Sequence, residues 1–132
     1  PVEGWREMVL TNVLGTALAV RAVLPALVAR RGRLVLTGSV LGRHALPGSL
    51  YSATKFAVAG IAETVRLELV GTGVGVTLVE PGPVATPFAG GGDPTGPALG
   101  ADDVARAVCF ALAQPDGVEV NELLLRPHGA TP

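Results

Sequence analysis

The chain has few of the features that would link it to an oxidising compartment, a nucleic acid or a membrane. A single cysteine among 132 residues excludes a disulfide within the chain. A formal net charge of -1 gives no basic surface for nucleic acid and no polybasic patch for anionic lipids. Gly, Arg or Thr interrupts each apolar run before it reaches the roughly 18 residues that a membrane span needs. We therefore expect a cytoplasmic protein that contacts neither nucleic acid nor membrane.

Metal ligands and reactive thiols are also scarce. His44 and His128 are far apart in the sequence and have no partner at ligand spacing, so we predict no metal site. Cys109 stands among apolar residues in a helical pattern, and we expect it to be a small buried side chain.

Most of the chain is the apolar sequence of a globular domain. Hydrophobic residues make up 48% and charged residues 16%, which is enough apolar surface to bury a core. The first residue is a proline rather than a methionine, and a helical pattern begins within a few residues. We interpret residues 1–132 as a single partial domain, a fragment of a longer protein.

Helical and strand-like segments alternate along the chain. Hydrophobic periodicity predicts helices over residues 5–29, 50–69 and 102–113. Short runs that are apolar throughout predict strands over residues 33–37, 74–79 and 122–126. Strands of this kind, separated by helices, indicate an α/β fold with a parallel sheet covered on both faces.

Two interruptions of this pattern have expected consequences. Pro25 is predicted to kink the first helix or to mark a weak point in it. Residues 89–100 are rich in Gly and Pro and lack periodicity, which predicts a mobile loop beside the substrate.

The pentapeptide Tyr51-Ser52-Ala53-Thr54-Lys55 opens the second predicted helix. A tyrosine and a lysine four residues apart share one helix face, so the ammonium is expected to lower the pKa of the phenol. A phenol with a pKa below its usual value of about 10 is an acid/base catalyst near neutral pH.

Small and polar residues follow two of the predicted strands. Thr37-Gly38-Ser39 ends the first strand and Pro81-Gly82-Pro83 ends the second. The carboxyl ends of parallel strands meet at one edge of a sheet, where ligands bind. By itself each of these motifs is more often a turn, and a lone Tyr-x-x-x-Lys is more often a surface pair.

Together, in this order, the motifs resemble the C-terminal half of the short-chain dehydrogenase/reductase family. The resemblance rests on Asn12 in Thr-Asn-Val-Leu-Gly, Ser39 in Thr-Gly-Ser-Val-Leu-Gly, the segment from Tyr51 to Lys55, and residues 81–86, Pro-Gly-Pro-Val-Ala-Thr. Residues 120–127 are also similar to a subgroup of NADP-dependent 3-hydroxy acid and clavaldehyde dehydrogenases. One departure is the interval of twelve residues from Ser39 to Tyr51, one shorter than in many members, with Thr37 as the nearest alternative hydroxyl.

The resemblance implies a fold and an activity. The fold is the C-terminal part of a doubly wound parallel-sheet NAD(P)-binding Rossmann fold, and the nucleotide-binding strands with their glycine-rich phosphate loop are absent from these residues. The activity is an NAD(P)-dependent oxidoreductase that interconverts a carbonyl and an alcohol by hydride transfer. The alternative is a catalytically inactive fragment that acts as an association partner.

The resemblance also implies roles for individual residues and a cofactor, NADP (or NAD). The catalytic set comprises Asn12, Ser39, Tyr51 and Lys55. The cofactor-binding set comprises Thr37, Tyr51, Lys55, Pro81, Gly82, Val84 and Thr86. Flanking residues that are candidate contacts for a small carbonyl or alcohol substrate are Arg43, His44, Leu46 and Phe88.

A second copy of the chain is the expected protein partner. The first helix carries an apolar stripe too wide for one buried face, and Ala53, Ala57 and Gly60 give the second helix a flat edge. The resemblance implies a homodimer or homotetramer through these two helices.

Overall fold

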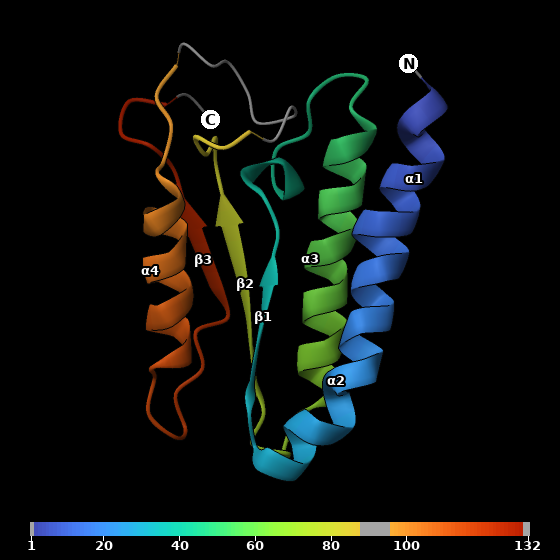
Figure 1. Ribbon diagram of the computed structural model, residues 1–132. Coiled ribbons are helices and arrows are strands. Elements are labelled where there is room, and N and C mark those ends of the chain that lie inside the picture. The colour runs from blue at the N-terminus through green and yellow to red at the C-terminus, as the bar shows by residue number, and fades with distance from the viewer. Residues whose placement is uncertain (1, 88–95, 131–132) are drawn as a thin grey trace.

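The computed structural model describes residues 2–87 and 96–130, and three parallel strands form its centre (Figure 1). The strands are β1 (Arg33–Thr37), β2 (Gly75–Pro81) and β3 (Glu122–Leu125), in the order β1-β2-β3. Leu36 of β1 is aligned with Leu78 of β2, and Leu78 with Glu122 of β3. The predicted parallel α/β sheet is confirmed.

Helices lie on both sides of this sheet (Figure 1). On one side, α3 (Leu50–Glu68) and the long helical segment at the N-terminus pack together, and α4 (Ala101–Leu112) lies on the other. Ser49 caps α3, because its side chain accepts a hydrogen bond from Ser52 N. All helix and strand bounds differ from those predicted by only a few residues.

The N-terminal helical segment changes its hydrogen-bond pattern along its length. It begins with a 3-10 turn (η1, Val2–Gly4) and α1 (Trp5–Val9), passes through a π-helix (η2, Leu10–Gly15) and continues as α2 (Thr16–Arg30). α2 runs through Pro25 without ending there, so the irregular turn lies at η2 and not at the proline.

By length and composition alone, the helical segment Val2–Arg30 is long and apolar enough to cross a membrane, with a mean hydropathy of 1.7 in its most apolar window. The prediction that every apolar run is too short for a span was therefore wrong for this segment. Core helices of soluble proteins meet the same criterion, but they are mostly buried, whereas only 6% of this window is buried. One part of the segment does face the sheet, since Val20 is buried in the core and Leu24 and Leu27 pack beside it.

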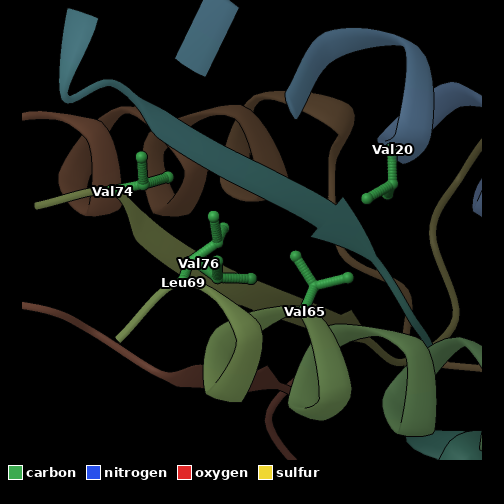
Figure 2. Packing of buried hydrophobic residues seen from close by; sticks show 5 residues of the cluster. All are labelled: Val20, Val65, Leu69, Val74 and Val76. Atoms are coloured by element: carbon green, nitrogen blue, oxygen red, sulfur yellow. The ribbon is translucent and has the colours of Figure 1, made fainter. Parts of the chain in front are cut away.

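The core lies between these helices and the sheet (Figure 2). One cluster joins Val20 of α2, Val65 and Leu69 at the end of α3, and Val74 and Val76 at the start of β2. A second cluster of Val58, Ala62 and Leu78 continues toward the carboxyl end of the strands. The buried apolar residues Val58, Ala62, Val65 and Leu69 recur at helical spacing, and Ile61 beside them is partly buried.

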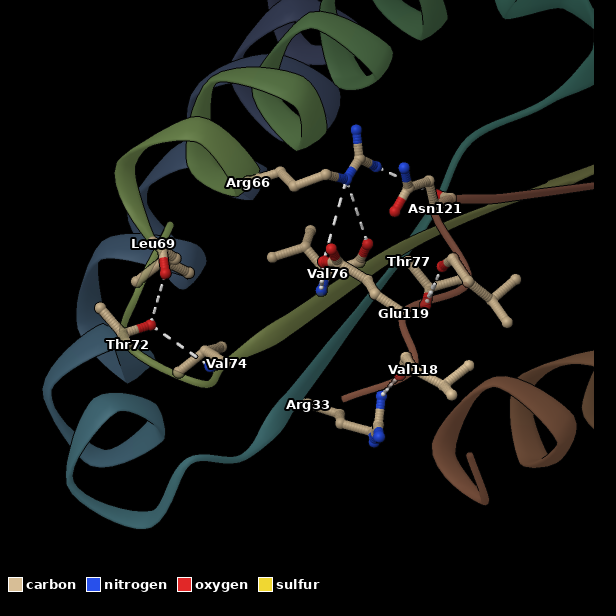
Figure 3. Close-up of polar contacts among 11 residues, drawn as sticks. Arg33, Arg66, Leu69, Thr72, Val74, Val76, Thr77, Val118, Glu119 and Asn121 are labelled. Atoms are coloured by element: carbon tan, nitrogen blue, oxygen red, sulfur yellow. Dashed lines mark hydrogen bonds and ion pairs between the residues drawn. The ribbon is translucent and has the colours of Figure 1, made fainter. Parts of the chain in front are cut away.

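Polar contacts fasten the opposite, amino end of the sheet (Figure 3). The Arg33 guanidinium donates to the backbone carbonyls of Gln114, Pro115 and Val118, which fixes the connection from α4 to β3. Arg66 donates to the carbonyls of Val76 and Asn121. These bonds hold the strands at the end remote from the motif residues.

Cys109 corrects one prediction, because it is exposed on α4 together with Phe110. α4 buries Ala111. Helical periodicity correctly predicted the helix. Apolar residues occupy its exposed face as well as its buried face, so the pattern did not show that Cys109 is exposed.

Candidate active site

The motif residues come together at the carboxyl edge of the sheet. Thr37 ends β1 and Ser39 follows it, Pro81 ends β2, and α3, of which Tyr51 is the second residue, begins at the same end of the molecule (Figure 1). Ser39 starts a 3-10 turn (η3, Val40–Gly42), which connects β1 to the loop before α3. Parallel pairing of β1 with β2 places these two strand ends side by side.

Tyr51 lies between Ser39 and Lys55. Its half-buried side chain is hydrogen-bonded to the Ser39 side chain. Lys55 Nζ lies 5.5 Å from the centroid of the Tyr51 ring, within the usual range of a cation–π contact. Lys55 Nζ also donates to the Thr37 carbonyl over 3.2 Å, so the end of β1 holds the ammonium in place.

Burial dominates the acid/base balance of this pair. It raises the pKa of Tyr51 above its usual value, and the hydrogen bond from Ser39 offsets part of that shift. Burial likewise lowers the pKa of Lys55. The prediction that the ammonium brings the phenol pKa below its usual value is therefore wrong for this structure, because desolvation of the phenol is the largest effect and raises its pKa.

Asn12 lies in the π-helix, where it faces the start of α3. Its Nδ2 donates to Thr54 Oγ1 over 3.1 Å, and Thr54 Oγ1 donates to the Tyr51 carbonyl over 2.7 Å. The Asn12 carbonyl accepts a hydrogen bond from Thr16 Oγ1 at 2.8 Å. The amide thus compensates its unfavourable position in a helix by anchoring the turn that carries Tyr51.

The segment after β2 runs close to β3. Gly82 N donates to the Leu125 carbonyl over 2.7 Å, and a Cβ at Gly82 would lie 3.3 Å from Pro127. Val84 forms an isolated parallel bridge with Leu99, in which Ala85 and Leu99 donate the hydrogen bonds. No described residue accepts a hydrogen bond from the Val84 N–H. Thr86 is exposed, with its own N–H donating to the Val84 carbonyl.

The predicted substrate contacts are placed unequally. His44 and Leu46 are exposed on the loop between η3 and α3, beside the site. Arg43 is instead engaged with two carboxylates, Glu80 at 2.8 Å and Glu122 at 2.5 Å. Phe88 and most of the loop predicted over 89–100 lie outside the described residues.

Two polar residues at the site were not predicted. Thr54 is 2% exposed and links Asn12 to the Tyr51 carbonyl, although it lies inside the recognised pentapeptide. Glu80 is fully buried next to Pro81. A carboxylate in an otherwise apolar strand was the signal in the sequence that could have revealed it.

Comparison with known proteins relates the chain to one family. Residues 1–94 match the family model for short chain dehydrogenases. An uncharacterized oxidoreductase of Staphylococcus saprophyticus is 40% identical over 129 residues, which cover 96% of this chain and 55% of that protein. The chain spans about half the length of the curated relatives of this kind that it matches.

Solved structures agree with this relation. An alcohol dehydrogenase from the archaeon Thermococcus sibiricus, complexed with 5-hydroxy-NADP, is 32% identical and matches 100% of this chain and 57% of its own, with a TM-score of 0.89. Serine dehydrogenase from Escherichia coli is 36% identical and matches 95% of this chain and 54% of its own, with a TM-score of 0.79. The matched family model, the fold and the order of the motifs along the chain lead to one conclusion: the chain belongs to the short-chain dehydrogenase family.

Proposed function

We propose that the protein containing this chain is an NAD(P)-dependent oxidoreductase that interconverts a carbonyl and an alcohol. The observation that carries the proposal is the arrangement of Tyr51, whose side chain is hydrogen-bonded to Ser39 while Lys55 Nζ lies 5.5 Å from its ring. An acid, an oxyanion-stabilising hydroxyl and a cation at one sheet edge are the groups that carbonyl reduction needs.

The residues present fit a nicotinamide cofactor. The carboxamide oxygen of the cofactor needs a hydrogen-bond donor. The Val84 N–H is available for this role, because no described residue accepts a hydrogen bond from it. Gly82 keeps the backbone beside it free of a side chain, and Lys55 and Thr37 line the adjacent strand end. When bound, the cofactor supplies or accepts the hydride. Pro81 and Thr86 complete the proposed cofactor-binding set.

In the reduction, Tyr51 donates its phenolic proton to the substrate oxygen as negative charge develops on that atom. Ser39 donates a hydrogen bond to the same oxygen and stabilises the charge. Positive charge on Lys55 favours the phenolate that Tyr51 leaves behind. Asn12 acts at a distance, because its bond to Thr54 fixes the turn that presents Tyr51.

We propose NADP as the preferred cofactor and a hydroxy acid or small carbonyl as substrate. Two related structures are complexes with 5-hydroxy-NADP and NADP+ and support this cofactor, although a third contains NAD. The resemblance of residues 120–127 to NADP-dependent 3-hydroxy acid dehydrogenases supports the substrate class. His44, Leu46 and Phe88 are the proposed substrate contacts, and the cytoplasm is the proposed location.

The proposed protein partner is a second copy of this chain rather than a membrane or a nucleic acid. Large apolar side chains are exposed along α1, η2 and α2, among them Trp5, Leu14 and Leu18. Phe56 of α3 is exposed as well. Contact between these helices in a homodimer or homotetramer would cover this surface.

The proposed function is tested by absorbance at 340 nm in the complete protein. We expect consumption of NADPH, and slower consumption of NADH, with at least one member of a panel of small aldehydes, ketones and 3-oxo acids. Absence of turnover with every carbonyl, together with absence of NADP+ reduction by the matching alcohols, would contradict the proposal.

A further inference from the structure

A buried carboxylate stands beside the candidate site and has no part in the chemistry described so far. Glu80 is 0% exposed and precedes Pro81 at the end of β2. Both of its oxygens accept hydrogen bonds from Arg43 Nε, at 2.8 and 3.1 Å. An unpaired carboxylate would be costly in this position, so Arg43 makes the burial of Glu80 possible.

Arg43 is anchored to the sheet at a second point. Its Nη2 lies 2.5 Å from Glu122 Oε1 at the start of β3. The two acids hold the pKa of Arg43 above its ordinary value, Glu80 more strongly than Glu122. The guanidinium therefore stays charged and links Glu80 of β2 to Glu122 of β3.

The same arginine terminates the turn that begins at Ser39. Arg43 N donates to the Val40 carbonyl over 3.0 Å, and Gly42 N donates to the Ser39 carbonyl over 2.8 Å. Leu41 N donates to Ser39 Oγ over 3.1 Å, so the turn directly orients the catalytic hydroxyl. On its other side the turn lies against α3, since a Cβ at Gly42 would come within 2.9 Å of the Lys55 carbonyl.

We propose that Arg43 is a positioning residue that ties the η3 turn to Glu80 and Glu122 and thereby keeps Ser39 within hydrogen-bond reach of Tyr51. A single 3-10 turn has weak internal hydrogen bonds and does not hold its own position. Charge-assisted bonds to a buried acid supply that constraint. The proposal deepens the proposed function, on which its relevance to turnover rests.

The test follows the Tyr51 phenol by NMR of ¹³Cζ-labelled tyrosine in the complete protein, with the Tyr51 signal identified by its loss in Tyr51→Phe. Ser39→Ala is expected to raise the titration midpoint of Tyr51, because the Ser39 hydrogen bond lowers its pKa. Arg43→Met/Glu80→Gln is expected to shift the midpoint in the same direction by at least half as much.

The double variant is the decisive one because it removes one positive and one negative charge and buries no unpaired ion. Arg43→Met alone also removes a nearby cation, which would move the midpoint without any change of position. Arg43→Lys keeps the charge but not the planar fork that spans two carboxylates, so a smaller shift in the same direction is expected. It provides a second measurement if the double variant does not fold.

Arg106→Gln is the matched control, because Arg106 pairs with Asp103 on the exposed side of α4. It is expected to leave the Tyr51 midpoint unchanged. A wild-type midpoint in the double variant, or an equal shift in the control, would overturn the proposal, as would a Ser39→Ala variant without any shift.

Turnover separates this proposal from the function on which it rests. We expect the double variant to lose about tenfold or more in kcat while its affinity for NADPH changes less than threefold. If the wild-type protein reduces no carbonyl, the proposed function fails, yet the titration still decides whether Arg43 positions Ser39.

Discussion

Lys55 is held at the site against the effect of its own burial. Desolvation lowers its pKa, and its Nζ remains bonded to the Thr37 carbonyl. A lysine whose folded-state pKa lies below its unfolded value contributes stability above the unfolded pKa and loses it as pH falls through the folded pKa. The charged form is therefore the one that the fold disfavours.

This gives a prediction for Lys55→Met. At pH 7 the variant is expected to gain stability relative to the wild type, because no ammonium is buried. The gain should shrink as pH rises toward 10.5, the ordinary pKa of lysine. Urea denaturation at pH 7, 8, 9 and 10 measures the difference, and a gain that stays constant or grows with pH would contradict the expected shift.

Tyr51 titrates in the other direction and outside that window. Its pKa is raised, so its contribution to stability is complete below about pH 10 and is lost as pH rises through the folded value. The wild type and Lys55→Met both retain Tyr51, so the difference between their stabilities below pH 10 reports on Lys55.

At the scale of the elements, the π-helix η2 positions Asn12 beside α3, and Asn12 contributes little to the stability of the fold. Asn12 loses helix propensity relative to alanine by up to about 0.7 kcal/mol and gains roughly 1 kcal/mol from a typical hydrogen bond. The two effects nearly cancel, so the residue is better explained by the bond it makes to Thr54 than by helix stability.

We therefore expect Asn12→Ala to change the free energy of unfolding by less than about 1 kcal/mol while lowering kcat of the complete protein at least tenfold. Thr11→Ala, at an exposed position of the same π-helix, is the control and should change neither quantity by a comparable amount. A loss of stability well above 2 kcal/mol in Asn12→Ala would show that the residue mainly supports the fold.

The opposite end of the sheet yields a converse expectation. Arg33 donates three hydrogen bonds to the chain before β3, whereas Arg30 is exposed at the end of α2. Arg33→Gln should cost about 2 kcal/mol of stability with kcat retained, because the site lies at the far end of β1. Arg30→Gln should cost less than about 0.5 kcal/mol. Equal effects in chemical denaturation would contradict the conclusion that the Arg33 hydrogen bonds stabilise the connection from α4 to β3.

How far the sequence predicted these elements depended on which interactions are local. Periodicity placed α3 and β1 almost to the residue, because each follows from which neighbours along the chain are apolar. Convergence of Ser39 and Gly82 followed from parallel strands alone. The Arg43–Glu80 pair spans 37 residues, and no local pattern specifies it.

The acid/base balance was beyond the sequence for a different reason. The spacing of Tyr51 and Lys55 correctly predicted that they lie together. The sign of the Tyr51 shift depends on how much solvent the assembled loops exclude, which spacing does not show. Cys109 shows the same limit, since helix periodicity did not reveal that the face of α4 that carries Cys109 is exposed.

At the scale of the whole molecule, the exposed apolar side chains of α1, η2 and α2 predict association. Leu18 is 59% exposed, more than its neighbours Leu14 and Trp5 on the same helical segment. Leu18→Glu in the complete protein is expected to shift a dimer or tetramer toward smaller species in light scattering coupled to gel filtration. Val118→Glu, at an exposed position before β3, is the control. A monomeric wild-type protein would rule out the proposed self-association.

The central claim is that this half of the molecule carries the acid/base chemistry of a reductase, and Tyr51→Phe tests it most directly. In the complete protein, hydride transfer from NADPH is followed by stopped-flow absorbance at 340 nm, and NADPH binding is measured separately by fluorescence. We expect at least a hundredfold loss of the transfer rate with NADPH affinity retained, because the phenolic proton is removed and little else. Glu68→Gln, at an exposed position at the end of the same helix, should behave as the wild type. Near-normal hydride transfer in Tyr51→Phe would contradict the account.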